Sequence, residues 1–373
     1  MELYSKLLVL GMMSGTSMDG LDCLITEIQI KCFDKLKFKI IEKKSFNIPT
    51  KLRNGISKIV DNPQINYLSL HRKLGNYYTS CVSQLNNHAQ LDLISYHGQT
   101  IFHKERIKSI QIGDPLPLSN HFNIPILFNF READIKVGGT GAPLMPFLDW
   151  LIFRNSKFND ITLNIGGISN ITYIPKNGIK NQVIGFDTGP GMSLIDECCL
   201  YFWNVPFDKD GGKSKKGKVN QKILNDLMKH PFIDLNFPKS TGRDIFGKKI
   251  THEIIKMHTG ENPYNILRTF VAFTAKSISK NLYKIRNFSP LENRLFVSGG
   301  GVHHSVLIDD LKLYSGFKRL HDLNDVGVNP KYKEALLMAV LGYTRFNNVS
   351  NNMPSVTGAK NETVLGDIFI NKI

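Results

Sequence analysis

Hydrophobic positions along the chain alternate between short continuous runs and longer stretches with helical spacing. The short runs predict buried strands at residues 6–13, 21–30, 91–96, 125–130, 161–165, 171–174 and 295–297. Apolar residues that recur every three or four positions predict helices over 67–85, 265–285 and 332–346. Alternation of strands and helices is typical of an α/β fold.

Two segments far apart in the chain share one pattern. Residues 6–30 predict a β-hairpin with a glycine-rich tip, and residues 161–174 predict a second hairpin with Gly166 and Gly167 at its tip. We therefore expect two structurally related halves. The glycine-rich stretch 137–143 predicts a hinge between about residues 130 and 158. We place the first domain at 1–135 and the second at 136–373, with the last ~20 residues returning to the first.

Composition narrows the classes of protein to consider. The 373 residues are 42% hydrophobic, which is enough to bury the cores of two domains. The net charge is +15, but the lysines are spread along the chain, so we expect attraction of anionic ligands and no nucleic-acid partner. Five cysteines without a C-x-x-C pattern fit a reducing cytoplasm. The apolar run 7–10 is too short to span a membrane.

Three glycine-rich turns each follow a short apolar strand, at residues 15–20, 166–170 and 299–301. Glycine lets backbone amides approach a ligand closely, and exposed amides in a turn bind anions such as phosphate. Any one of these turns could equally be a tight hairpin, whereas three at strand ends favour nucleotide binding. Asp19 and Asp22 add carboxylates that suit Mg²⁺.

Two other motifs are rejected. Gly212-Lys213-Ser214 resembles the end of a P-loop, but Phe207 stands where that motif requires glycine. The segment 252–258 resembles a zinc-binding helix, but Lys256 occupies the position of the second histidine. We expect a solvated loop in the first case and no zinc site in the second.

Two acidic residues are candidates for chemistry. Asp187 follows a short apolar run and precedes a turn with two glycines and a proline, which leaves room for a substrate beside a general base. A carboxylate there could also cap its own turn. Glu334 lies at the start of the 332–346 helix, where it either contacts a nucleotide or complements the helix dipole.

Eight segments together resemble the 1,6-anhydro-N-acetylmuramic acid kinase family. They occur in the family's order and cover almost the whole chain: MSGTSMDG (13–20), HGQT (97–100), QIGD (111–114), GGTGAPL (138–144), NIGGISN (164–170), DTGPG (187–191), PKSTGR (238–243) and PSVTGA (354–359). The resemblance implies an actin- and hexokinase-like fold, with two α/β domains and a cleft between them that binds ATP with Mg²⁺.

The resemblance also implies the nucleotide site. It assigns the phosphates to Gly15, Thr16, Ser17, Met18, Asp19, Gly20, Leu21 and Asp22 and, on the other domain, to Gly166 and Gly167. It assigns the adenosine side to Gly299, Gly300 and Gly301, and brings Glu334 close to the nucleotide. The metal would arrive with ATP and would not sit in a cage made only of protein ligands.

The implied reaction opens the 1,6-anhydro bridge with water while oxygen 6 receives the γ-phosphoryl group of ATP. Asp187 matches the family's general base. The substrate side corresponds to His97, Gln99, Arg131, Asp134 and Gly189, and the arginine suits the lactyl carboxylate of the sugar. Such an enzyme recycles cell-wall fragments in the cytoplasm of a bacterium. A homodimer is compatible with the sequence.

Three residues depart from the family pattern, and two other functions stay open. Met192 and His304 stand where asparagine is common, and Asn129 replaces a common aspartate. The first two departures put one contact near Asp187 and one nucleotide contact in doubt. The alternatives are a related sugar kinase with another acceptor, and a non-catalytic module that binds nucleotides or nucleic acid.

Overall fold

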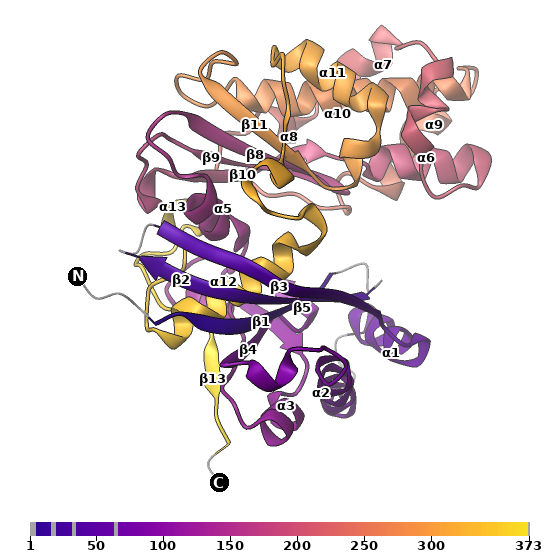
Figure 1. Cartoon of the computed structure of the whole chain (residues 1–373). Coiled ribbons are helices and arrows are strands. Elements are labelled where there is room, and N and C mark those ends of the chain that lie inside the picture. The colour runs from indigo at the N-terminus through magenta and orange to yellow at the C-terminus, as the bar shows by residue number, and fades with distance from the viewer. Residues whose placement is uncertain (1–4, 16–19, 32–34, 63–65, 372–373) are drawn as a thin grey trace. The chain divides into compact units, whose positions relative to one another are not determined.

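The computed structural model describes residues 5–15, 20–31, 35–62 and 66–371. The chain divides into two compact units (Figure 1). Unit 1 comprises Met1–Ile152 and Lys331–Ile373, and unit 2 comprises Phe153–Pro330. The chain thus passes between units at 152/153 and 330/331, whereas the sequence placed one passage at 135/136 and a return only for the last ~20 residues.

Unit 1 contains a mixed six-stranded sheet, a separate two-stranded hairpin and helices around them. Its strands are β1 Leu7–Ser14, β2 Gly20–Lys31, β3 Lys35–Asn47, β4 Leu93–Tyr96, β5 Gln99–Lys104, β6 Lys108–Ile112, β7 Ile126–Phe128 and β13 Asp367–Phe369. Its helices are α1 Thr50–Asp61, α2 Leu68–Val82, α3 Pro115–Phe122, α4 Glu132–Lys136, α5 Met145–Phe153, α12 Lys333–Phe346 and α13 Pro354–Thr357. Helix α5 ends one residue into unit 2.

Unit 2 contains a five-stranded sheet and a large helical layer. Its strands are β8 Asn159–Ile165, β9 Ile168–Ile174, β10 Ile184–Pro190, β11 Asn293–Ser298 and β12 His321–Asp322. Its helices are α6 Ser193–Trp203, α7 Gln221–Met228, α8 Pro231–Asp234, α9 Lys248–Met257, α10 Pro263–Leu282 and α11 Ser305–Ser315. The predicted α/β class is confirmed.

The two sheets share one strand order, which confirms the predicted kinship of the two halves. Unit 1 runs β3-β2-β1-β4-β7 before its extra strand β13, and unit 2 runs β10-β9-β8-β11-β12. In each, the first three strands are antiparallel neighbours and the next two are added in parallel, whereas β13 pairs antiparallel with β7. Both predicted hairpins, β1–β2 and β8–β9, are present.

The core of unit 1 depends on a glycine in its central strand. Side chains alternate across a strand, so Leu10 and Met12 face a buried cluster that includes residues of α1 and α2. Gly11 faces the opposite way, where an added Cβ would lie 2.0 Å from the carbonyl oxygen of Ala335 and 2.9 Å from the Cβ of Ala339 in α12. The absent side chain therefore lets α12 pack directly on the sheet.

We expect the substitution Gly11→Ala to destabilise unit 1 by about 1–3 kcal/mol, because overpacking a tight contact typically costs that much. Urea unfolding measures the effect as a lower midpoint. Gly260→Ala is the matched control, since an added Cβ there meets no atom within 4 Å. Equal midpoints for the two variants would contradict the close packing of α12 on β1.

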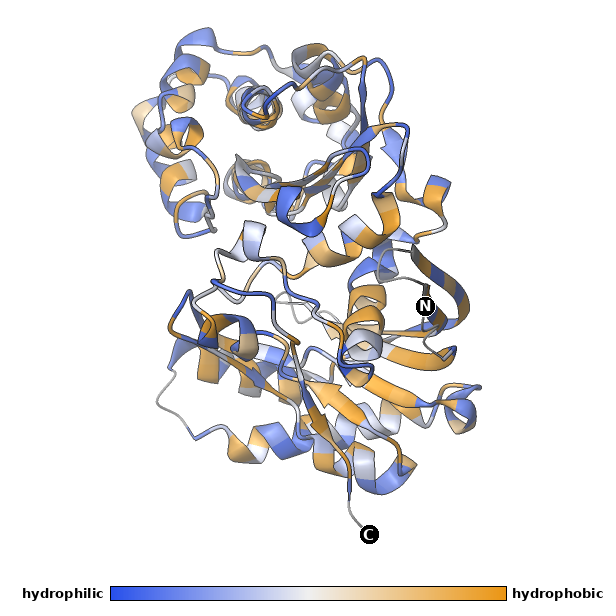
Figure 2. Ribbon diagram, turned by 90° about the vertical axis from the view of Figure 1, so that its left-hand side faces the viewer, coloured by the Kyte–Doolittle hydropathy of each residue, from blue (hydrophilic) through white to orange (hydrophobic). Residues whose placement is uncertain are grey.

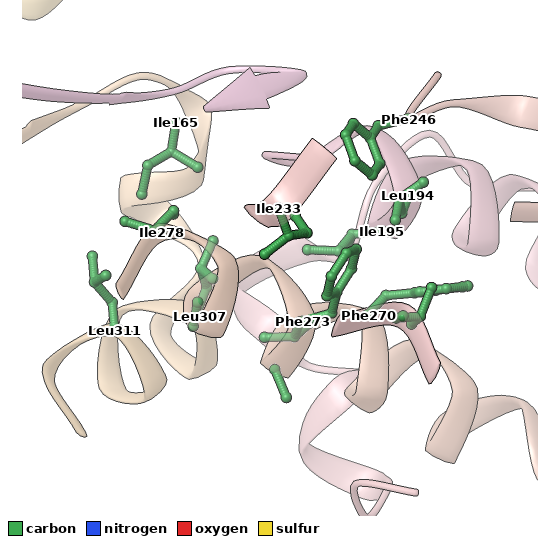
Figure 3. Close-up of a cluster of buried hydrophobic side chains, with 14 of the residues drawn as sticks. Ile165, Leu194, Ile195, Ile233, Phe246, Phe270, Phe273, Ile278, Leu307 and Leu311 are labelled. Carbon is green, nitrogen blue, oxygen red and sulfur yellow. The ribbon is translucent and has the colours of Figure 1, made fainter. Parts of the chain in front are cut away.

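Helix α10 forms the centre of the unit 2 core. It lies against α6, α11 and β10, and its buried side chains include Phe270, Phe273 and Ile278. Figure 3 shows these side chains gathered with neighbours from β8, α6, α8 and α11. Ile165, the last residue of β8, belongs to this cluster, so the core fixes the strand end immediately before Gly166.

Hydropathy follows the same layering. In Figure 2 several strands of unit 1 are largely hydrophobic, whereas its helices alternate between hydrophilic and hydrophobic residues, as expected of helices that cover a sheet. Within the described residues, no helix combines the length and the apolar character required to cross a bilayer.

Candidate active site

Three candidate residues in unit 1 follow the carboxyl ends of adjacent parallel strands. Gly15 comes directly after β1, His97 directly after β4, and Arg131 three residues after β7. Open α/β sheets bind ligands at this edge, because the loops that leave parallel strands meet there. The order of the strands in the sheet thus places Gly15 and Arg131 at the same edge, although they are more than 110 positions apart in the sequence.

Buried His97 pairs with partly buried Arg131. The Nε–H group of Arg131 donates to His97 Nε2 at 2.9 Å, and the other ring nitrogen, Nδ1, lies 2.9 Å from the carbonyl oxygen of Gly98. Since a carbonyl only accepts, Nδ1 carries the proton and the ring is neutral. Burial, and next the guanidinium of Arg131, lower the pKa of His97 to about 3. The ring therefore orients the arginine without adding a second positive charge.

Arg131 itself is partly exposed, yet the protein packed around it affects its charge. Burial lowers its pKa to about 10, and the nearby Glu334 opposes that shift. An arginine at this pKa keeps its charge at neutral pH. A partly desolvated guanidinium of this kind is suited to binding a carboxylate or a phosphate.

Glu334, in the first turn of α12, has Asp22 of β2 as an acidic neighbour. Part of its side chain meets solvent, yet the protein packed around it raises its pKa, and Asp22 raises the pKa further against the opposing effects of Lys333 and Arg131. Asp22 accepts a 2.5 Å hydrogen bond from the hydroxyl of Ser45. Two neighbouring carboxylates repel one another, and a cation between them would relieve that repulsion.

Asp134 is fully buried and makes several hydrogen bonds. Its carboxylate accepts from the backbone N–H of Gly141 at 2.9 Å, the hydroxyl of Thr357 at 2.9 Å and the amide of Asn352 at 3.2 Å. The residue joins the glycine-rich loop 138–143 to the C-terminal segment 352–357. Its side chain thus holds together two of the segments that carried the family resemblance.

The remaining unit 1 candidates lie around β1 and β2. Gln99 is buried, and its amide donates to the carbonyl oxygen of Gly15 over a long 3.5 Å. Gly20 and Leu21 begin β2, where Leu21 pairs with Ser14 of β1. Four predicted phosphate-binding residues lie outside the described residues: Thr16, Ser17, Met18 and Asp19.

In unit 2, two predicted glycine turns lie side by side at one sheet edge. β8 and β11 are adjacent and parallel, and they end at Ile165 and Ser298, directly before Gly166 and Gly299. Gly299 has a φ of +86°, and an added Cβ would lie 2.6 Å from the carbonyl oxygen of Ile165. The close approach of the two turns therefore requires glycine at 299.

The other glycines of these turns differ in their surroundings. Gly301 is buried, and an added Cβ would lie 2.4 Å from the side chain of Ile165. Gly300 is exposed and has no atom within 4 Å of an added Cβ. The turn thus combines a tightly packed residue with one that has open space beside it.

Asp187 lies on β10 at the same end of this sheet. It pairs with Asn170 of β9, and the register shifts between Asp187 and Gly189, so Thr188 forms a bulge. Its Oδ2 accepts the backbone N–H of Thr241 at 2.9 Å and the hydroxyl of Ser240 at 3.2 Å. Bulges of this kind redirect side chains and occur beside active sites.

A buried network fixes the backbone that follows Asp187. The carbonyl oxygen of Thr188 accepts from the hydroxyl of Ser277 at 2.5 Å and from the amide of Asn281 at 3.0 Å, both on α10. Gly189 has a φ of +124°, and an added Cβ would lie 2.6 Å from the Ser277 hydroxyl. The sequence did not single out Ser277 and Asn281, because nothing in their own helix distinguishes them from core residues.

Arg243 and Asp196 form a second feature that the sequence did not assign. The guanidinium of Arg243 lies against Gly167, where an added Cβ would come within 2.8 Å of it. Asp196 is in the first turn of α6; burial, and next Glu197, raise its pKa to about 6, whereas Arg243 opposes the shift. The signal for Arg243 was its place at the end of the PKSTGR segment.

The three departures from the family pattern have structural explanations. The backbone N–H of Met192 donates to the carbonyl oxygen of Gly166 at 2.8 Å, and its side chain packs on the core. Asn129 adopts a φ of +57°, which asparagine tolerates, and its amide donates to two carboxylates. His304 is buried, caps α11 by accepting from the N–H of Leu307, and lies 3.2 Å from Asp208.

Asp208 gives a prediction for stability against pH. Burial alone would raise its pKa, but hydrogen bonds from His304, Lys213 and Ser214 outweigh that effect and hold the pKa at about 2, below the ordinary 3.8. This carboxylate therefore stabilises the fold above about pH 4, and the stabilisation is lost as the pH falls towards 2. We expect Asp208→Asn to unfold more easily at pH 7, with the difference from the unmodified chain shrinking below pH 4. Urea unfolding at several pH values measures it, and a constant difference would contradict it.

Both rejected motifs lie in unit 2. Lys213 lies between two short 3-10 turns, Lys209–Gly211 and Ser214–Lys216, and its ammonium lies 5.2 Å from the centre of the Trp203 ring. His252 lies on α9 against Tyr201. Among the residues that the structure describes, no group of three or more His, Cys, Asp or Glu side chains is placed to hold a metal ion.

Comparison with known proteins gives one consistent result. Residues 7–371 match the model of a protein family described as anhydro-N-acetylmuramic acid kinase. A protein of that name from Bacillus thuringiensis subsp. konkukian (strain 97-27) is 36% identical, over 96% of this chain and 98% of the relative. Another of that name from Clostridioides difficile (strain 630) is 37% identical, over 96% of this chain and 97% of the relative.

Similarity to solved structures is weaker. The activator of the 2-hydroxyisocaproyl-CoA dehydratase from Clostridium difficile, with bound ADPNP, overlaps with a TM-score of 0.41 at 10% identity, covering 91% of this chain and 96% of that chain. An overlap of this size places no ligand on the present chain.

Proposed function

The chain belongs to the anhydro-N-acetylmuramic acid kinase family, and from this premise we propose that it converts 1,6-anhydro-N-acetylmuramic acid, water and ATP into N-acetylmuramic acid 6-phosphate and ADP. Water adds to C1, and the bond from C1 to the bridging oxygen breaks. That oxygen stays on C6 and forms the new bond to the γ-phosphorus. The activity depends above all on Asp187, a carboxylate at a sheet edge whose Oδ2 is held by two donors.

Asp187 acts as the general base in this proposal. A carboxylate that accepts the proton of water as the water attacks C1 contributes typically 10²–10⁴ in rate. Such a base must be held in one orientation, because small displacements cost much of the rate. The bulge at Thr188, its bonds to α10 and the hydrogen bonds from 240–241 supply that rigidity.

Arg131 binds the lactyl carboxylate of the sugar in this proposal. Its guanidinium is partly buried and charged, and His97 orients it by accepting a hydrogen bond from Nε–H. The neutral ring of His97 leaves the arginine as the cation of the pair. We keep Gln99 and Gly189 as proposed substrate contacts, and we assign Asp134 the task of holding the loop 138–143 beside Arg131.

The glycine turns are the proposed nucleotide contacts. Gly166, Gly167, Gly299, Gly300 and Gly301 lie at one edge of the unit 2 sheet, and Arg243 adds a cation beside them. In unit 1 the proposed phosphate contacts run from Gly15 to Asp22.

Mg²⁺ would be bound together with ATP. Burial, and next Asp22, raise the pKa of Glu334, and a divalent cation between these two carboxylates would relieve their repulsion. The cation would neutralise charge on the phosphate oxygens.

The test is an assay of the purified protein with ATP, Mg²⁺ and the anhydro-sugar, with products identified by mass spectrometry. We expect a ring-opened sugar phosphate and one ADP for each. A panel of reducing sugars is run beside it: preference for one of them would show a kinase for an ordinary hydroxyl, and absence of any sugar phosphate would contradict kinase activity. We place the reaction in the bacterial cytoplasm, in the recycling of cell-wall fragments.

A further inference from the structure

Asp187 is bracketed by three consecutive residues from another part of unit 2. Its own backbone N–H donates to the carbonyl oxygen of Lys239 at 3.1 Å. Its carboxylate accepts from the next two residues, Ser240 and Thr241. The orientation of the proposed base therefore depends on the position of residues 239–241.

This segment has no regular secondary structure to hold it. It lies between α8 and α9, outside any helix or strand, and Ser240 is exposed. A segment with few backbone hydrogen bonds of its own depends on contacts with neighbouring elements to hold it in place. Those contacts decide how firmly Asp187 is oriented.

Lys239 supplies one such contact. Its ammonium donates to the carbonyl oxygens of Phe232 at 2.8 Å and Ile233 at 3.3 Å, in α8, and lies 4.5 Å from the centre of the Phe232 ring. Hydrogen bonds from a charged donor are about twice as strong as neutral ones. On the other side of the segment, the ring of Phe237 stacks on that of Phe186 at 4.8 Å.

We propose that Lys239 is a positioning residue for Asp187, and that its ammonium, clamped on α8, holds the segment that orients the carboxylate. This inference rests on the proposed role of Asp187 as the base. Lys239 acts through Ser240 and Thr241, and its side chain takes no part in the transfer of atoms.

The charges around Lys239 make the clamp sensitive to pH. Burial, and next Lys284, lower the pKa of Lys239 to about 8. Asp234 on α8 and Asp187 on β10 oppose the shift, and Lys280 on α10 adds to it. Loss of the proton above pH 8 weakens the clamp, since the bonds to the α8 carbonyls are no longer charge-assisted.

Lys284 offers a matched control. Its ammonium also donates to the carbonyl oxygen of Ile233, at 2.7 Å, and to that of Leu235, at 2.8 Å. It therefore binds the same turn, but it contributes nothing to the segment 239–241. Removing it takes a cation away from Lys239 and leaves the contacts of Asp187 in place.

The experiment compares Lys239→Met, Lys239→Arg, Lys284→Met and Asp187→Asn in single-turnover ring opening, with KM values, pH profiles and melting temperatures. We expect Lys239→Met to slow the step about 10- to 100-fold at pH 7 while KM for the sugar and for ATP changes less than about 3-fold. Lys239→Arg restores most of the rate and moves the alkaline decline above pH 8. Lys284→Met keeps the rate within about 2-fold and also moves that decline to higher pH.

The outcomes separate this inference from the proposed base. A fast Lys239→Met beside an inactive Asp187→Asn would overturn the role of Lys239 alone. Equal losses of rate in Lys239→Met and Lys284→Met, in step with equal losses of melting temperature, would also overturn it, because both would then act only on stability. Full activity of Asp187→Asn would overturn the base and this role with it.

Discussion

Asp187→Asn is expected to lower the rate of sugar phosphorylation by about 10²–10⁴, because the amide cannot accept the proton of the attacking water. Its oxygen can still accept the hydrogen bonds from Ser240 and Thr241, so the backbone around it should keep its place. The affinity for ATP should change less than about 3-fold, since the proposed base contacts the water and not the nucleotide. Single-turnover kinetics and titration with an ATP analogue measure the two quantities.

The control for this substitution is Asp226→Asn, which removes an exposed carboxylate of α7 that pairs with Lys229. It should leave both the rate and the affinity unchanged. A fast Asp187→Asn enzyme would mean that another group activates the water. A slow enzyme that has also lost its affinity for ATP would mean that the residue supports the nucleotide site.

Arg131→Met is expected to raise KM for the anhydro-sugar by about 30-fold or more, because losing the charged partner of a bound carboxylate costs about 2–5 kcal/mol. His97 would also lose the donor to its Nε2. Steady-state kinetics with the sugar varied at saturating ATP measures the change. Arg131→Lys should recover little, since an ammonium cannot reproduce the planar guanidinium.

Two comparisons make the result specific. With 1,6-anhydro-N-acetylglucosamine, which lacks the lactyl carboxylate, the variant and the unmodified enzyme should turn over at similar low rates. Arg72→Met, which removes an exposed arginine of α2, should leave KM unchanged. If the substitution at 131 weakened both sugars equally, Arg131 would have a structural task and the carboxylate would bind elsewhere.

The sequence predicted those elements whose own residues are mostly apolar. β1, β8, α10 and α12 are buried along most of their length, so their periodicity is visible. β3 was not predicted, because this edge strand is largely exposed and rich in lysine.

The glycines that led to the predicted hinge at 130–158 have a packing role. An added Cβ at Gly139 would lie 2.1 Å from the carboxylate of Asp134, and Gly141 donates its N–H to the same group. These glycines allow the loop to pack closely around a buried acid. The last part of the predicted hinge folds instead as α5, whose hydrophobic residues made no clear periodic pattern.

Within the candidate site, the residues found from the sequence lie in glycine-rich or acidic motifs. Asp187 and the turns at Gly166 and Gly299 belong to this group. Ser240 and Thr241, which orient Asp187, lie 53 and 54 positions away from it in the sequence. Ser277 and Asn281, which hold Thr188, lie 89 and 93 positions away from that residue. Contacts of such separation arise only from the fold, so local pattern could not reveal them.

Isotope labelling of the solvent follows the oxygen atoms of the reaction directly. In H₂¹⁸O, at early times, the product should carry one ¹⁸O at C1 and none on the phosphate, by mass spectrometry and by the ³¹P isotope shift, and Asp187→Asn should form this species far more slowly. Label on phosphorus, or a phosphorylated sugar whose anhydro ring is intact, would contradict ring opening by water coupled to transfer onto oxygen 6.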